Sequence, residues 1–198
     1  MMTPLSPTAF AGLLVGLSEL ILAYLSYSYS KLEPLKKLKL LAYGLIILAV
    51  KEVIFNILYL LNPFYEIVGT MVEAIGLTIV TYSVISMINM NTRYFIALMV
   101  VLAAISSTLT VVASDPLILD VSFTFFLPLF IALILFRDYV RFKDGVLLLT
   151  SVGFYLYSLS VIVKAALALV TTSIELGVSL SLVVKLSSMV TVLVAFLK

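Results

Sequence analysis

The chain has 198 residues, of which 64% are hydrophobic, with no His, Cys or Trp and a formal net charge of +2. Without His and Cys it cannot supply the usual ligands of haem, iron–sulfur clusters or typical zinc sites, nor a thiol nucleophile or a histidine base. Most of the basic residues lie in short connections between apolar segments, which gives no support to nucleic-acid binding. We therefore expect a non-enzymatic protein with no cofactor and no metal.

The hydrophobic residues fall into seven apolar segments. Each segment approaches the roughly 20 residues that a helix needs to cross about 30 Å of hydrocarbon. In chain order they span residues 9–29, 40–61, 66–89, 94–113, 118–136, 146–170 and 176–197. No basic residue precedes the first segment, so we expect a retained helix rather than a cleaved signal peptide. The sequence predicts an all-α integral membrane protein, a seven-helix bundle forming one domain over residues 1–198.

Basic residues outside these segments occur only after the first, third, fifth and seventh. They are Lys31, Lys36, Lys37, Lys39, Arg93, Arg137, Arg141, Lys143 and Lys198. The other connections carry no basic residue. Because connections rich in Lys and Arg stay on the cytoplasmic side, we expect a cell-membrane protein with its amino terminus outside and its carboxyl terminus in the cytoplasm.

The fifth to seventh segments align on the first three without gaps, at an offset of 109 residues. Gly44 then matches Gly153, and Glu66 matches Glu175. This alignment predicts a 3+1+3 parallel repeat in which the fourth helix is a linker. The alternative is chance similarity, because leucine-rich hairpins of similar length also align in this way.

Pro128 lies in the middle of the fifth segment, within FTFFLPLFIAL. Proline lacks an N–H and its ring crowds the preceding turn, so we expect a kink and a freed carbonyl group near Thr124. Pro63 and Pro116 fall in outer turns, where a missing N–H costs little.

Six ionisable residues lie inside the apolar segments. They are Glu19, Lys51, Glu52, Glu73, Lys164 and Lys185. At 1.5 Å per residue, Glu73 and Lys164 lie about 9–11 Å from the outer surface and the others about 14–17 Å. An unpaired charge at the bilayer centre costs at least about 2.5–3.5 kcal/mol. We therefore predict one layer that pairs Glu73 with Lys164, and a midplane layer that holds the other four.

The neighbours of these charges indicate which way they point. Glu19 shares a helix face with Gly12 and Gly16, and Glu73, Lys164 and Lys185 likewise have Gly and Ser on their own faces. Small residues mark helix–helix contacts in lipid, so we expect the charges to point into the bundle. Lys51 and Glu52 lie about 100° apart on a helix, which predicts that they address different neighbours. Two interpretations stay open: pairing that fixes helix packing, or a polar pathway for protons or ions.

Two segments resemble archaeal seven-helix membrane sensor domains, the kind joined to histidine kinases or other signalling modules. The resemblance rests on VEAIGLTIVTYSVISM in the third segment, on LLLTSVGFYLYSLSVIV in the sixth, and on the layout of the whole chain. It implies a membrane sensor. The family pattern continues into a cytoplasmic output domain that this sequence does not contain, so we expect the output to come from another chain.

Lys185, near the middle of the last segment, resembles the retinal lysine of microbial rhodopsins, with Glu73 in the place of the counter-ion. Ser181 stands four residues earlier, where that family has an aspartate, and no Trp is present to sandwich a polyene. The topology also resembles that of small 3+1+3 sugar transporters, whose helix-breaking prolines and Pro-Gln motif are absent. Retinal binding and transport of a small solute, proton or ion are therefore alternatives.

The expected function is that of a non-enzymatic multi-pass protein acting through partner chains, because the sequence shows no catalytic constellation and no soluble domain. It would be an accessory or structural subunit of a membrane complex, such as a respiratory assembly, or a sensor-like module without its own output domain. The expected partners are membrane lipids and other membrane protein subunits.

Overall fold

The structure is a computed structural model that describes residues 7–32, 37–55, 58, 64–88, 92–113, 117–170 and 174–197. Within these ranges the chain forms seven helices and no strand. They are α1 (Pro7–Tyr29), α2 (Leu38–Val50) with its π-helical continuation η2 (Lys51–Phe55), α4 (Phe64–Met87), α5 (Thr92–Ala113), α6 (Leu117–Phe142), α7 (Gly145–Val170) and α8 (Ile174–Phe196). The prediction of a seven-helix bundle is confirmed. The predicted end of the second helix, at residue 61, lies outside the described residues.

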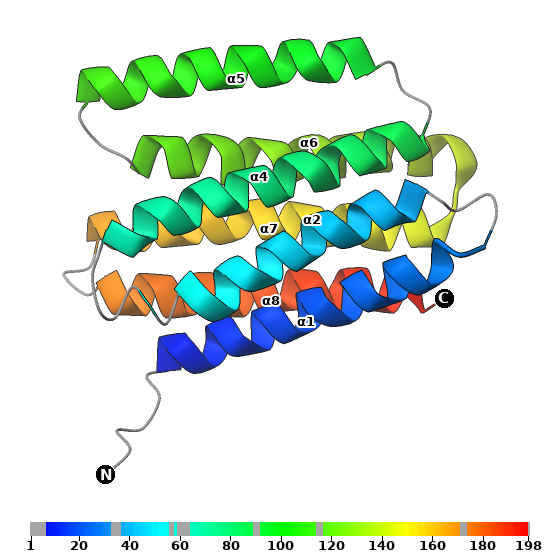
Figure 1. The fold of residues 1–198 in the computed structure, drawn as a ribbon, viewed down its shortest axis with the longest axis horizontal. Helices are drawn as coiled ribbons and strands as arrows, with labels where there is room; N and C mark the ends of the chain where they lie inside the picture. Colours follow the sequence, from blue (N-terminus) through cyan, green and yellow to red (C-terminus); the bar gives the residue numbers. More distant parts are fainter. Residues whose placement is uncertain are drawn as a thin grey trace.

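Six of the helices close into a ring. Contacts run from α1 to α2, from α2 to α4, from α4 to α6, from α6 to α7, from α7 to α8 and from α8 back to α1. Helix α5 lies outside this ring, at one edge of the bundle, and contacts α6 and α4 (Figure 1). Successive helices run in alternate directions, so every second connection lies at the same end of the bundle (Figure 1).

Five of the described helices are long and apolar enough to cross a membrane. The spans are Thr8–Tyr29, Val68–Met87, Ser122–Phe142, Gly145–Leu167 and Gly177–Phe196. Helix α5 has a shorter apolar run, Phe95–Ser106. Helix α2 has 13 residues before Lys51 and Glu52 begin the π-helical turn. These lengths agree with a multi-pass membrane protein.

Helix α6 is longer than its apolar segment. It continues to Phe142, six residues past the predicted end at 136, so the predicted loop is reduced to Lys143 and Asp144. The prediction was wrong here because loss of apolarity marks where a helix leaves the hydrocarbon, and charged side chains such as Arg137 sustain a helix in water. Lys143, with φ of 56°, ends α6 in the left-handed conformation, and Asp144 Oδ1 accepts the Val146 N–H at 2.9 Å to cap α7.

Pro128 lies inside α6 and is buried, and the helix continues on both sides of it. Neighbouring helices and local adjustments can satisfy the backbone groups that a proline frees in a transmembrane helix. The kink at Pro128 stays a prediction.

Glycines bring three pairs of ring helices into close approach. An added Cβ on Gly16 would lie 2.6 Å from Val53 Cγ2, which places α1 directly against η2. On Gly44 it would lie 3.1 Å from the Gly76 carbonyl oxygen, so the backbones of α2 and α4 touch. On Gly153 it would overlap Val192 of α8. Small residues permit such contacts in lipid, where packing rather than water exclusion drives helix association.

A candidate site: a charge cluster inside the ring

Four ionisable side chains and a tyrosine meet inside the helix ring. Lys51 and Glu52 come from η2, Glu73 from α4, Tyr157 from α7 and Lys185 from α8. We call these five residues the charge cluster. All but Lys51 are buried, and the side chain of Lys51 is only 17% exposed. Long-range packing has therefore brought together polar groups that are far apart in the sequence.

Each carboxylate of the charge cluster contacts both ammonium groups. Lys185 Nζ donates to Glu52 Oε1, and to Glu73 Oε1 at 2.5 Å. Lys51 Nζ lies 2.7 Å from Glu73 Oε2 and 3.1 Å from Glu52 Oε1. Two positive and two negative charges thus cancel within direct contact. Such pairing is what permits formal charges at membrane depth.

Tyr157 completes the cluster from the α7 side. Its hydroxyl donates to Glu73 Oε1 at 2.7 Å, and Lys185 Nζ lies 4.5 Å from the centre of its ring. The same side chain thus binds an anion through its hydroxyl and a cation through its ring face. Tyr157 is a site residue that the sequence pattern did not predict. The available signal was a tyrosine near the middle of an apolar segment, sharing a face with Gly153 and Ser160.

The π-helical turn positions the two adjacent charges of η2. The prediction that Lys51 and Glu52 address different neighbouring helices is confirmed, because Lys51 contacts Glu73 of α4 and Glu52 contacts Lys185 of α8. The prediction assumed regular α-helical spacing, whereas η2 is π-helical from Lys51 to Phe55. A π-helical turn accommodates more residues than an α-helical turn and occurs often at functional sites. Both side chains can then reach the interior of the ring.

The predicted grouping of Glu52 with Lys51 and Lys185 is confirmed, but the prediction that Glu73 lies in a separate charge layer is wrong. Glu73 was placed in a shallower layer than Lys51 and Lys185, yet it contacts both. The predicted depths depend on where each helix begins and on the helices being parallel and untilted. A shift of one helical turn is sufficient to bring Glu73 level with Lys51 and Lys185. Lys164 lies two turns beyond Tyr157 on α7 and is half-buried. Its pairing with Glu73 stays a prediction.

Glu19 of α1 is buried without joining these ion pairs. Its exposed fraction is 0%, and neither of its carboxyl oxygens has a hydrogen-bond partner. One turn earlier, an added Cβ on Gly16 would lie 3.5 Å from Cβ of Glu52, so this face of α1 packs on the cluster. The charged groups that act on Glu19 are Glu52, Lys185, Glu73 and Lys51. Glu19 therefore lies beside a cluster whose charges already cancel without it.

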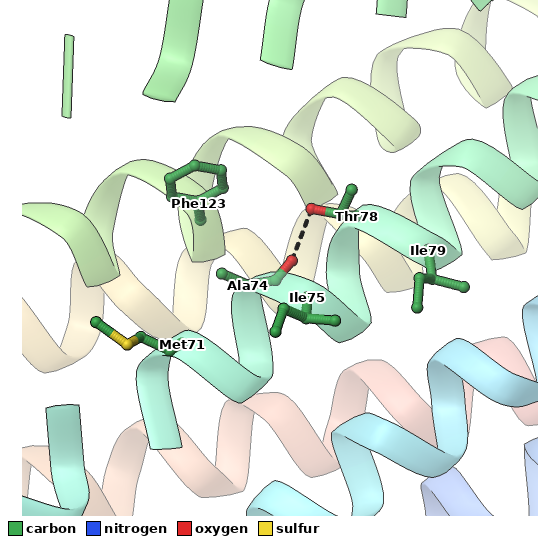
Figure 2. Close-up of a pocket in the computed structure, with 6 residues that line it drawn as sticks. All are labelled: Met71, Ala74, Ile75, Thr78, Ile79 and Phe123. Atoms are coloured by element: carbon green, nitrogen blue, oxygen red, sulfur yellow. Dashed lines mark hydrogen bonds between the residues drawn. The ribbon is translucent and has the colours of Figure 1, made fainter. Parts of the chain in front are cut away.

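A separate hollow of about 380 Å³ lies between α4 and α6. Figure 2 shows its lining, which is formed by Met71, Ala74, Ile75, Thr78, Ile79 and Phe123. The one hydroxyl in the lining, that of Thr78, donates to the Ala74 carbonyl at 2.7 Å (Figure 2). The walls therefore offer apolar contacts only, as the acyl chain of a lipid requires.

Among the described residues, no group of three or more acidic residues has a placement that could hold a metal ion. No protein family, curated protein or solved structure matches this chain.

Proposed function

We propose that this chain is a non-enzymatic, multi-pass protein of the cell membrane that acts through partner chains. It would serve as a subunit of a membrane complex or as a sensor-like module whose output lies in another protein. The observation that carries the proposal is the position of α5 outside the ring (Figure 1). A helix so placed is the one most open to contact with another membrane protein.

The exposed face of α5 suits a helix–helix contact. Ile96, Val100, Val101 and Ile105 are 51–64% exposed, and between them lie the exposed alanines Ala97 and Ala104. Ala97 and Ala104 are seven residues apart, so they lie on one face. Alanines so spaced allow a second helix to approach closely within lipid.

Photo-crosslinking tests the proposal with a matched pair of positions. Val101 on α5 is 53% exposed and Val183 on α8 is 54% exposed, so both would meet lipid equally in a lone protein. With a photoreactive residue at each position in turn, we expect Val101 to crosslink to one reproducible membrane protein and Val183 to crosslink to lipid. Equal lipid labelling at both positions in native membranes would contradict a partner on α5.

We further propose the orientation with the amino terminus outside. Alternation of the helices brings the carboxyl ends of α1, α4 and α6 to one end of the bundle (Figure 1). In the sequence, most basic residues outside the apolar segments lie beside these helix ends. The chain has no native cysteine, so single cysteines can be labelled cleanly. A cysteine at Lys37 is expected to react with an impermeant thiol reagent only in inverted vesicles. Reaction in intact cells would reverse the orientation.

The proposed 3+1+3 repeat has partial support. Gly44 packs on the following helix of its half, α4, and Gly153 packs on the following helix of its half, α8. At the offset of 109, however, Ser188 and Val192 beside Gly153 correspond to Ile79 and Ser83, about one turn from Gly76 and Val80. If the two halves are repeats, α8 is therefore shifted by about one turn along α7 compared with the position of α4 along α2. The Glu66–Glu175 match falls on side chains outside the described part of the structure.

A second candidate function, transport of a proton or cation, is favoured by one observation. Glu19 is a buried carboxyl beside a polar ring interior, and such groups mark proton and ion paths in membrane proteins. Proton flux into liposomes that contain the purified chain alone would support transport over the partner proposal. Retinal binding has less support, because the Lys185 amine contacts two carboxylates directly.

A further inference from the structure

We propose that the Glu19 carboxyl is a reversible proton-binding site, which holds one proton in the resting bundle and can exchange it with water. The inference concerns this side chain alone and holds whether the protein works through partners or as a transporter. Glu19 is fully buried, and both of its oxygens lack a hydrogen-bond partner. In its ionised form, the Glu19 carboxylate would be a buried charge without a hydrogen bond, which is the state of this side chain with the highest free energy. A bound proton removes the charge.

The charges around Glu19 favour the binding of one proton, which adds a single positive charge to the group. On the elements that α1 contacts, η2 contributes Lys51 and Glu52, and α8 contributes Lys185. Glu73 of α4 is the remaining charged neighbour. With Glu19 included, three carboxyl groups face two ammonium groups. One proton makes the group neutral, and Glu52 and Glu73 are each held by two lysines. The proton therefore belongs on Glu19.

The same neighbours make release of the proton feasible. Release breaks the O–H bond of the Glu19 carboxyl, leaves the electron pair on its oxygen and transfers the proton to a water molecule. Lys185 and Lys51 then attract the new carboxylate, which offsets part of its burial cost. The Glu19 carboxylate then competes with Glu52 and Glu73 for contact with Lys185. Proton exchange at α1 would thus weaken the contacts that join η2, α4 and α8.

Infrared spectroscopy of the purified full chain in detergent tests the proposal. A protonated carboxyl has a C=O stretch distinct from that of a carboxylate and sensitive to D2O. At neutral pH we expect one such band in the wild type, its loss in Glu19→Gln, and its retention in Asp138→Asn, where the carboxylate pairs with Arg137 at the helix surface. Raising the pH should abolish the wild-type band, and lowering it should restore the band.

A second variant tests the charge count. Glu73→Gln leaves two carboxyl groups facing two ammonium groups, so Glu19 should ionise and the band should disappear although Glu19 is present. Circular dichroism and gel filtration establish that each variant compared is folded. Absence of the band from the wild type at neutral pH, or its persistence in folded Glu19→Gln, would overturn the proposal. A band that no pH change removes before unfolding would overturn its reversibility.

Discussion

Replacing Glu73 with glutamine is expected to destabilise the bundle by about 3–5 kcal/mol, the usual cost of removing one partner from a buried ion pair. Glu73 contacts Lys51, Lys185 and Tyr157, and so ties α4 to η2, α7 and α8. Glutamine retains the shape but leaves Lys51 and Lys185 with Glu52 as their only direct carboxylate partner. Ionisation of Glu19 would restore the net charge without restoring these contacts. The measurement is the unfolding midpoint in detergent, compared at fixed pH.

The double variant Glu73→Gln with Lys51→Met separates ion pairing from packing. It removes one charge of each sign and leaves Glu52 paired with Lys185. We expect it to be more stable than Glu73→Gln alone, because Lys51 and Lys185 then no longer share Glu52 as their one directly contacting carboxylate. If the losses of stability from Glu73→Gln and from Lys51→Met simply add in the double variant, the pairing of Lys51 with Glu73 contributes little.

Gly44→Leu is expected to prevent α2 and α4 from packing and to leave no stable bundle. Even one added carbon atom at Gly44 meets Val80 Cγ2 at 2.7 Å, the Val80 backbone nitrogen at 3.0 Å and the Gly76 carbonyl oxygen at 3.1 Å. Backbone atoms cannot rotate away as a side chain can, so the two helices must separate. Gly44→Ala should cost about 1–3 kcal/mol, the range for overpacking a tight contact.

Gly145 supplies the matched control for this experiment. It begins α7, and an added Cβ there meets nothing within 4 Å. Gly145→Ala and Gly145→Leu should leave the unfolding midpoint unchanged or raise it slightly, because both residues favour a helix over glycine. Equal losses from the Gly44 and Gly145 variants would point to helix propensity or expression rather than to the α2–α4 contact.

The two predictions concern one structural arrangement. Gly16, Gly44 and Gly153 let the helices of the ring approach closely, and the charge cluster lies where those helices converge. If α2 and α4 separated, Lys51 and Glu73 would no longer hold the 2.7 Å contact between Nζ and Oε2. Replacing a small residue at the interface should therefore also weaken the ion pairs. When a glycine substitution and a charge substitution are combined, their losses of stability should not be additive.

Local sequence patterns were sufficient to predict the helices and the direction in which their polar residues point. Apolar length predicted seven helices, and the spacing of Gly12, Gly16 and Glu19 predicted one inward face of α1, whose residues are buried. Both results follow from local rules, because hydrocarbon thickness sets helix length and the 3.6-residue period sets which residues share a face.

Which polar groups meet depends instead on how the helices pack together. Helical period says nothing about how far one helix slides or tilts against another, and one turn is enough to exchange partners. That uncertainty put Glu73 in the wrong layer, and it left the role of Tyr157 unassigned. The π-helical turn at Lys51 and the lack of any hydrogen-bond partner for Glu19 depend on the packing of η2, α4 and α8 together. A hydrogen bond forms or fails within an ångström, a precision that a sequence pattern does not contain.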